Sequence, residues 1–210
     1  MFPLFLNVEN RLVLVVGGGP VGRRKAQALL LAGGRVRLVC LKPRPPDESS
    51  DRLCWLQEPY RVEHLEDVAL VFAAATADVN LQVTVDARQR GIWVNVADNS
   101  GISDFILPAV LRRGDLLIAV GTSGAAPALA QEVRDLLATQ FGDAFQHWVA
   151  ALAEIRPLIL ARVSDANSRR QLFHDLCRWD WLERFRNEDA TVVQADMIAE
   201  VTPKFREPRR

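Results

Sequence analysis

The chain has 210 residues, of which 49% are hydrophobic, so it can bury the core of one large domain or of two small ones. Its 26 basic side chains are balanced by 26 acidic ones, which excludes the strongly basic field typical of nucleic-acid binding. No apolar run is long enough to span a bilayer, and residues 1–6 are too short, without a basic leader, for a signal peptide. The three cysteines have no paired spacing, which favours a reduced cytoplasmic protein without a zinc site.

A glycine-rich turn between a strand and a helix is the first strong motif. Residues 12–16 are aliphatic and predict a buried strand, while residues 23–31 have the apolar spacing of a helix. Between them, Gly17, Gly19 and Gly22 fit the G-x-G-x-x-G spacing of dinucleotide sites. These positions suit a tight turn, a close approach of pyrophosphate and close helix packing, in that order. The alternative is a turn of the same shape that binds nothing.

The segment after this helix completes a βαβ unit. Residues 35–40 predict a second strand, and in many such folds an acidic residue at its end binds the ribose hydroxyls. Residues 40–44 contain no acid. Lys42 or Arg44 would then meet a 2′-phosphate and favour NADP, or both are ordinary solvated charges. The choice between NAD and NADP therefore stays open at this stage.

Strands and helices continue to alternate as far as residue 96. Residues 69–74 and 92–96 predict buried strands, and the helix between them, residues 79–89, has Asp78 as its expected N-cap. Two weaker patterns come earlier: residues 53–56 predict a short helix or strand, and residues 60–63 a short strand. This alternation favours a doubly wound parallel sheet of the α/β class.

The carboxyl ends of the predicted strands define one expected crevice. The loop from Gly17 to Gly22, Thr76 and residues 95–98 all follow strand ends. Ligands of doubly wound sheets bind beyond these ends, so we expect these residues to lie together.

The pattern changes after residue 103. Residues 104–111 and 116–120 read as extended segments joined by a turn at 112–115, which predicts a hairpin. A loop of small residues, 121–127, follows. Helices are then expected at residues 128–139, 144–160, 168–178, 181–186 and 192–201, with a loose tail from residue 202.

Several motifs in this order carry a family resemblance. They are residues 2–6 (FPLFL), 15–26 (VVGGGPVGRRKA), 73–76 (AAAT) followed by Asn80, 95–98 (NVAD), 105–109 (FILPA), and 122–124 (TSG) ahead of 127–130 (PALA). Together they resemble the precorrin-2 dehydrogenase / sirohydrochlorin ferrochelatase family, which forms the N-terminal part of siroheme synthase. The resemblance covers residues 1–137 well and the helical tail more loosely.

The resemblance implies a homodimer built from three parts. These are a Rossmann-type NAD-binding domain at residues 1–112, a hairpin-plus-helix dimerisation segment at 113–146, and a helical C-terminal domain at 147–210. The family oxidises precorrin-2 to sirohydrochlorin with NAD, and many members also insert ferrous iron to give siroheme. The sequence leaves open whether this chain retains the ferrochelatase step.

The resemblance also implies roles for single residues. Asp98 matches the family's key aspartate and would take the proton released during dehydrogenation. Cofactor contacts are expected at Gly17, Gly19, Pro20, Val21, Gly22, Leu41, Lys42, Thr76 and Asn95, and contacts with substrate carboxylates at Thr122 and Ser123. The competing interpretations are structural: Asp98 would cap a turn, and the polar residues would cap strands and helices. No histidine has metal-ligand spacing, so no resident metal site is expected.

Two other functions remain as alternatives. A non-catalytic module that senses a dinucleotide would bind it without turnover. A Rossmann oxidoreductase acting on another substrate would use the same crevice. The hairpin and the loop at residues 122–127 argue against both, because neither function needs them.

Overall fold

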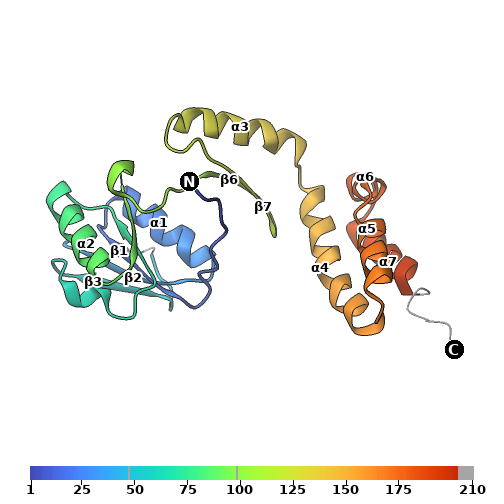
Figure 1. The fold of residues 1–210 in the computed structure, drawn as a ribbon, viewed down its shortest axis with the longest axis horizontal. Helices are drawn as coiled ribbons and strands as arrows, with labels where there is room; N and C mark the ends of the chain where they lie inside the picture. Colours follow the sequence, from blue (N-terminus) through green and yellow to red (C-terminus); the bar gives the residue numbers. More distant parts are fainter. Residues whose placement is uncertain (47, 98, 203–210) are drawn as a thin grey trace. The chain divides into compact units, whose positions relative to one another are not determined.

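The computed structural model describes residues 1–46, 48–97 and 99–202, and the chain divides into two compact units after Leu107. The first unit, Met1–Leu107, carries the glycine-rich turn. The second unit begins at Pro108 and carries a hairpin and the C-terminal helices (Figure 1).

The first unit is built on a five-stranded parallel sheet. Its strands lie in the order β3-β2-β1-β4-β5, and every neighbouring pair is parallel. The strands are β1 (Leu12–Val16), β2 (Arg35–Cys40), β3 (Leu53–Gln57), β4 (Leu70–Ala73) and β5 (Trp93–Val96). This order, with the reversal next to β1, is that of a doubly wound fold and confirms the predicted fold class.

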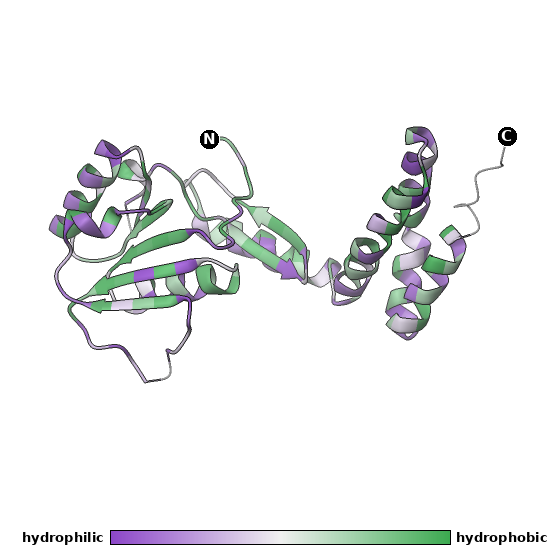
Figure 2. Cartoon of the chain, turned by 90° about the horizontal axis from the view of Figure 1, so that it is seen from below, coloured by the Kyte–Doolittle hydropathy of each residue, from purple (hydrophilic) through white to green (hydrophobic). Residues whose placement is uncertain are grey.

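Helices cover both faces of this sheet because alternate strand residues point to opposite sides. Val13 and Val15 pack with α1 (Pro20–Leu31) in one core cluster. Leu14 and Val16 pack with α2 (Ala77–Gln89) in another. The strands are accordingly hydrophobic along most of their length, whereas the two helices also carry hydrophilic residues (Figure 2).

Helix α1 ends as its glycines predict. Gly33 has a φ of +83°, in the left-handed region, and its N–H donates to the carbonyl of Leu30 at 3.0 Å. The N–H of Gly34 donates to the carbonyl of Leu29 at 2.9 Å. These two bonds form a Schellman motif, which turns the chain back into β2.

The structure settles two local predictions around β3. Residues 60–63 do not form a strand; a 3-10 helix, η1 (Val62–Leu65), occupies this stretch. It forms because β3 is the edge of the sheet with no strand beyond it, while the Nδ1 atom of His64 accepts the N–H of Arg61 at 3.0 Å. The ambiguous residues 53–56 belong to β3, which pairs with β2.

The N-cap of α2 is Thr76, not Asp78, which lies in the first turn. The helix begins early because the side chain of Asn80 accepts the N–H of Ala75 at 2.9 Å and organises the turn before it. A further 3-10 turn, η2 (Ser100–Ile102), follows β5.

The second unit starts with the predicted hairpin. Strands β6 (Ala109–Arg113) and β7 (Leu116–Val120) are antiparallel and joined by Gly114, with a φ of +57°, and Asp115. Residues 104–107, which were expected in the first strand of the hairpin, are not part of it. They belong to the first unit, where Asp104 forms hydrogen bonds with the backbone of Val94 in β5.

Helices make up the rest of the second unit. They are α3 (Pro127–Gln140), α4 (Ala144–Arg162), α5 (Ala166–Leu176), α6 (Trp179–Asn187) and α7 (Ala190–Val201). Ile155 and Ile159 of α4, Leu182 of α6 and Met197 of α7 form the centre of a continuous core. Within the described ranges, no helix is long and apolar enough to cross a membrane.

Candidate functional site

A crevice opens beyond the carboxyl ends of β1, β2, β3 and β4. It has a volume of about 670 Å³. The residues that line it are Val16, Gly17, Gly18, Gly19, Val39, Cys40, Leu41, Lys42, Glu58, Pro59, Tyr60, Ala74, Ala75, Thr76, Asp78, Val79 and Gln82. It therefore brings together five of the residues expected to contact a cofactor: Gly17, Gly19, Leu41, Lys42 and Thr76.

The surroundings of the three motif glycines differ, and each position favours glycine for a different reason. Gly17 has a φ of +115°, and a Cβ there would collide with the carbonyl of Ala74 at the end of β4. A Cβ on Gly22 would collide with the carbonyl oxygen of Gly17, so this position holds α1 against the turn. A Cβ on Gly19 would meet no atom within 4 Å. The space beside Gly19 is thus open, as a close approach by pyrophosphate requires.

The start of α1 suits an anion. Gly19 is the N-cap and makes no side-chain capping bond, Pro20 occupies the first turn, and no acidic residue lies in that turn. The first N–H groups of a helix lack partners within the helix and carry a partial positive charge. The residues present therefore fit the pyrophosphate of a dinucleotide.

The loop after β2 offers an apolar surface. The side chain of Leu41 is 72% exposed at the crevice. The carbonyl oxygen of Lys42 accepts the Nε1–H of Trp55 at 3.0 Å and the thiol of Cys40 at 3.3 Å. These bonds hold the backbone in place and leave both side chains of the loop available to a ligand, which suits the adenosine half of a dinucleotide.

Asn95 lies in the sheet rather than among the residues that line the crevice. It is 7% exposed, accepts a hydrogen bond from Lys25 at 3.0 Å and donates to the carbonyl of Phe105 at 2.9 Å. The structure therefore gives its side chain partners on α1 and on the segment after β5. Pro20, Val21 and Gly22 also lie outside the lining, in the first turn of α1.

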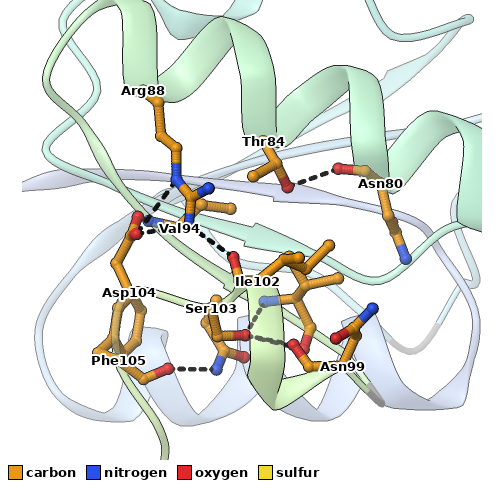
Figure 3. Close-up of polar contacts among 11 residues, drawn as sticks. Asn80, Thr84, Arg88, Val94, Asn99, Ile102, Ser103, Asp104 and Phe105 are labelled. Carbon is orange, nitrogen blue, oxygen red and sulfur yellow. Dashed lines mark hydrogen bonds and ion pairs between the residues drawn. The ribbon is translucent and has the colours of Figure 1, made fainter.

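The segment after η2 is bound tightly along β5 (Figure 3). The carboxylate of Asp104 accepts the N–H of Val94 at 2.9 Å and forms an ion pair with Arg88. The hydroxyl of Ser103 accepts the N–H of Val96 at 2.9 Å and donates to the carbonyl of Asn99. Asp98, the predicted catalytic residue, lies outside the described residues.

Sequence reasoning missed the polar residues that β3 and α2 add to the crevice. Glu58 and Tyr60 follow the end of β3, and Asp78 and Gln82 belong to α2. A firm assignment of residues 53–57 as a parallel strand would have placed Glu58 and Tyr60 at the same edge of the sheet.

Two contacts of these residues reach buried polar groups. The carboxylate of Glu58 is 2.9 Å from Nε2 of the buried His64, and this hydrogen bond lowers the pKa of Glu58 below its ordinary value. The hydroxyl of Tyr60 donates to Asp86 at 3.1 Å, and its burial raises the pKa of the phenol. At neutral pH the crevice therefore presents an ionised carboxylate and a neutral phenol.

Thr122 and Ser123 belong to the second unit, in the loop between β7 and α3. The hydroxyl of Thr122 accepts the N–H of Ala126 at 3.1 Å, and its carbonyl accepts the N–H of Ala125 at 3.0 Å. Ser123 has a φ of +53°. The loop is a tight turn whose capping bonds are made by Thr122.

The described residues contain no group of three or more His, Cys, Asp or Glu side chains that could hold a metal ion. Cys40, Cys54 and Cys177 are all free thiols.

The strand order, the glycine turn and the open helix N-terminus together define a Rossmann-type dinucleotide-binding domain. The chain belongs to the family described as "Putative NAD(P)-binding", whose profile matches residues 4–109, about half of the chain. This match confirms the expected class of cofactor, a nicotinamide dinucleotide.

Similarity to siroheme synthases over most of the chain confirms the resemblance to the family expected from the sequence motifs. The chain is 32% identical to the siroheme synthase of Chromobacterium violaceum over 206 residues, covering 93% of this chain and 43% of the relative. It is 36% identical to the siroheme synthase of Nitrosomonas europaea, covering 97% of this chain and 44% of the relative. The chain thus spans less than half the length of these synthases.

A solved structure confirms the fold over almost the whole chain. The structure described as "SirC, precorrin-2 dehydrogenase" matches with a TM-score of 0.75 at 21% identity. The match covers 97% of this chain and 100% of that structure.

Proposed function

We propose that this chain catalyses the NAD-dependent oxidation of precorrin-2 to sirohydrochlorin in siroheme biosynthesis. One observation carries the proposal: a chain with a dinucleotide crevice aligns over 93% of its length with a siroheme synthase. The match to the "SirC, precorrin-2 dehydrogenase" structure supports it, because that structure has the same fold and the alignment covers 97% of this chain and 100% of that structure.

The proposed reaction removes two hydrogens from the tetrapyrrole. A hydride passes from a carbon of precorrin-2 to the nicotinamide of NAD⁺, and a proton leaves the macrocycle, giving sirohydrochlorin, NADH and H⁺. Asp98, two residues after the end of β5, is proposed to accept that proton. A carboxylate at this position of the chain follows a strand whose carboxyl end lies at the same edge of the sheet as the glycine turn.

The geometry of the first unit supports the proposed cofactor contacts. The pyrophosphate is assigned to Gly17, Gly19 and the turn formed by Pro20, Val21 and Gly22. Leu41 and Lys42 are assigned to the adenosine. Thr76 borders the crevice from the start of α2, whereas Asn95 supports it from within the sheet.

Thr122 and Ser123 are proposed to bind carboxylates of the substrate. Their loop leads into the N-terminus of α3, where Ala126 makes no side-chain capping bond and the first turn contains no acidic residue. Such a helix start attracts carboxylates, and precorrin-2 carries several.

We further propose that the chain acts as a homodimer in the cytoplasm, with residues 113–146 in the dimer interface. A two-stranded hairpin is marginal by itself, and the exposed Leu129 and Leu136 of α3 offer apolar surface for a second copy. Three free thiols suit a reducing compartment.

An anaerobic assay tests the proposed function against its rivals. The purified chain is mixed with precorrin-2 and NAD, and absorbance follows the formation of NADH and sirohydrochlorin. We expect protein-dependent formation of both. Binding of NAD without any turnover would favour the sensing module, and turnover of a different substrate would favour the other oxidoreductase. Adding ferrous iron to the product tests the ferrochelatase step, in which iron is a substrate.

A further inference from the structure

The crevice has no acidic residue where doubly wound folds usually place one. That residue follows the second strand and binds the ribose hydroxyls of the adenosine, which favours NAD over NADP. Residues 40–44, at the end of β2, are Cys-Leu-Lys-Pro-Arg. The acid must come from elsewhere if the proposed preference for NAD is correct.

We propose that Glu58, from the end of β3, takes this role and selects NAD over NADP. The inference rests on the proposed function, since it identifies the residue that recognises the cofactor of that reaction. The register of the sheet carries it. Cys40 of β2 lies opposite Gln57 of β3, so Glu58 comes beside Leu41, one strand away from the usual position of the acid. Neighbouring strands are about 4.8 Å apart, a distance that a glutamate side chain spans.

The carboxylate of Glu58 is held in the crevice by a buried partner. Nδ1 of His64 accepts the N–H of Arg61, so its Nε2 carries the hydrogen and donates to Oε1 of Glu58 at 2.9 Å. His64 is 7% exposed, and the side chain of Glu58 is 37% exposed. Oε1 of Glu58 is thus held by His64, and Oε2 is left to meet a diol. Arg61 approaches that other oxygen only to 3.9 Å.

The other charges around the crevice agree with this role. Asp78 is a second acidic residue in the lining, and Lys42 is the one basic side chain among the described residues that line it. Arg44 is engaged elsewhere, because its Nε donates to the carbonyl of Glu48. A 2′-phosphate would place a charge of about −2 next to the carboxylate of Glu58 and be repelled by it. The hydroxyls of a ribose diol would instead donate hydrogen bonds to this carboxylate.

Binding titrations of the full chain test the proposal. NAD⁺, NADP⁺ and the 2′-deoxyadenosine analogue of NAD⁺ are titrated by calorimetry into the wild type and two variants. Glu58→Gln keeps an acceptor for His64 and removes the charge. Glu63→Gln is the matched control, because Glu63 is exposed in the neighbouring 3-10 helix and does not line the crevice.

For the wild type we expect NAD⁺ to bind at least about tenfold more tightly than NADP⁺, and the loss of the 2′-hydroxyl to cost a similar factor. In Glu58→Gln the dissociation constant of NADP⁺ divided by that of NAD⁺ should fall by roughly tenfold, because Lys42 remains to meet the phosphate. Removal of the 2′-hydroxyl from NAD⁺ should change the affinity of this variant little. The Glu63→Gln variant should match the wild type. A ratio unchanged by Glu58→Gln, or a wild type that prefers NADP⁺, overturns the proposal.

These titrations need no precorrin-2, so the two proposals fail in different ways. Turnover of precorrin-2 with an unchanged ratio in Glu58→Gln would refute the role of Glu58 alone. The expected change in ratio without turnover would refute the proposed reaction alone.

Discussion

Gly19 and Gly22 differ in what surrounds them, although both belong to one motif. A side chain on Gly19 would enter open space, whereas one on Gly22 would strike the carbonyl of Gly17. The motif thus combines a position beside open space with a position whose missing side chain lets α1 pack against the turn. This distinction is absent from the spacing of the glycines and comes from the structure.

Substitution separates the two roles. Gly19→Val should weaken dinucleotide binding by more than about 100-fold, because its side chain would fill the space for pyrophosphate, at a cost of about 1 kcal/mol in helix capping. Gly22→Ala should instead lower the free energy of unfolding by about 1–3 kcal/mol through overpacking. Calorimetry and urea unfolding measure the two effects. Normal NAD affinity in Gly19→Val would contradict the assigned position of the pyrophosphate.

Asp98 is the residue on which the proposed chemistry depends. Asp98→Ala should reduce kcat by at least about 100-fold, the usual contribution of a general base, and leave the dissociation constant of NAD unchanged. Anaerobic kinetics with precorrin-2 and a parallel titration with NAD give both values. An unaltered kcat would remove Asp98 from the mechanism.

Among the elements of the second unit, the helices α5 and α7 are each capped by a carboxylate. Asp165 accepts the N–H of Ser168 at 2.7 Å, and Asp189 accepts the N–H of Thr191 at 2.9 Å. These backbone hydrogen bonds lower the pKa of both carboxyls below the ordinary value of 3.8. The caps of α5 and α7 should therefore stabilise the fold only while they are ionised.

The pH dependence follows from the direction of these shifts. Because each pKa is lower in the folded chain, the caps contribute fully above pH 3.8 and lose their effect as the pH falls through the folded pKa. The double variant Asp165→Ala, Asp189→Ala should unfold at lower temperature than the wild type at pH 7. The difference in melting temperature between the two proteins should become smaller towards pH 2. Thermal scans monitored by circular dichroism measure this difference, and a difference independent of pH would contradict the role of the ionised caps.

Elements with a strong local signal could be predicted from the sequence. The runs at β1 and β4 are apolar because both faces of these strands are covered, and glycines mark both ends of α1. Edge elements carry weaker signals. Residues 53–56 are ambiguous between helix and strand in the sequence, and they form the edge strand β3, in which Leu53 alone is buried. Residues 60–63 alternate like a strand but have no neighbouring strand with which to pair.

The candidate site divides in the same way. Gly17, Gly19 and Thr76 lie at the crevice and could be placed from strand ends, whereas Leu41 and Lys42, which also line it, were expected from the family resemblance. Glu58 and Tyr60 could not, because their position depends on the pairing of β3 with β2. The partners of Asn95, which are Lys25 and Phe105, are likewise fixed by tertiary contacts that no local pattern encodes.

At the scale of the whole molecule, the chain covers 43–44% of the two siroheme synthases compared with it, yet matches the full length of the "SirC, precorrin-2 dehydrogenase" structure. Alignments that cover 93–97% of the chain include most of both units. We therefore propose that the two units together carry out the oxidation step, with the dinucleotide in the first unit.

The stoichiometry of a single anaerobic reaction shows whether this chain oxidises precorrin-2 with NAD. With limiting precorrin-2 and excess NAD, the purified chain should form one NADH for each sirohydrochlorin, and Gly19→Val at the same concentration should form neither at a comparable rate. Sirohydrochlorin formed without NADH, or NAD bound with no product at all, would contradict the proposed oxidation.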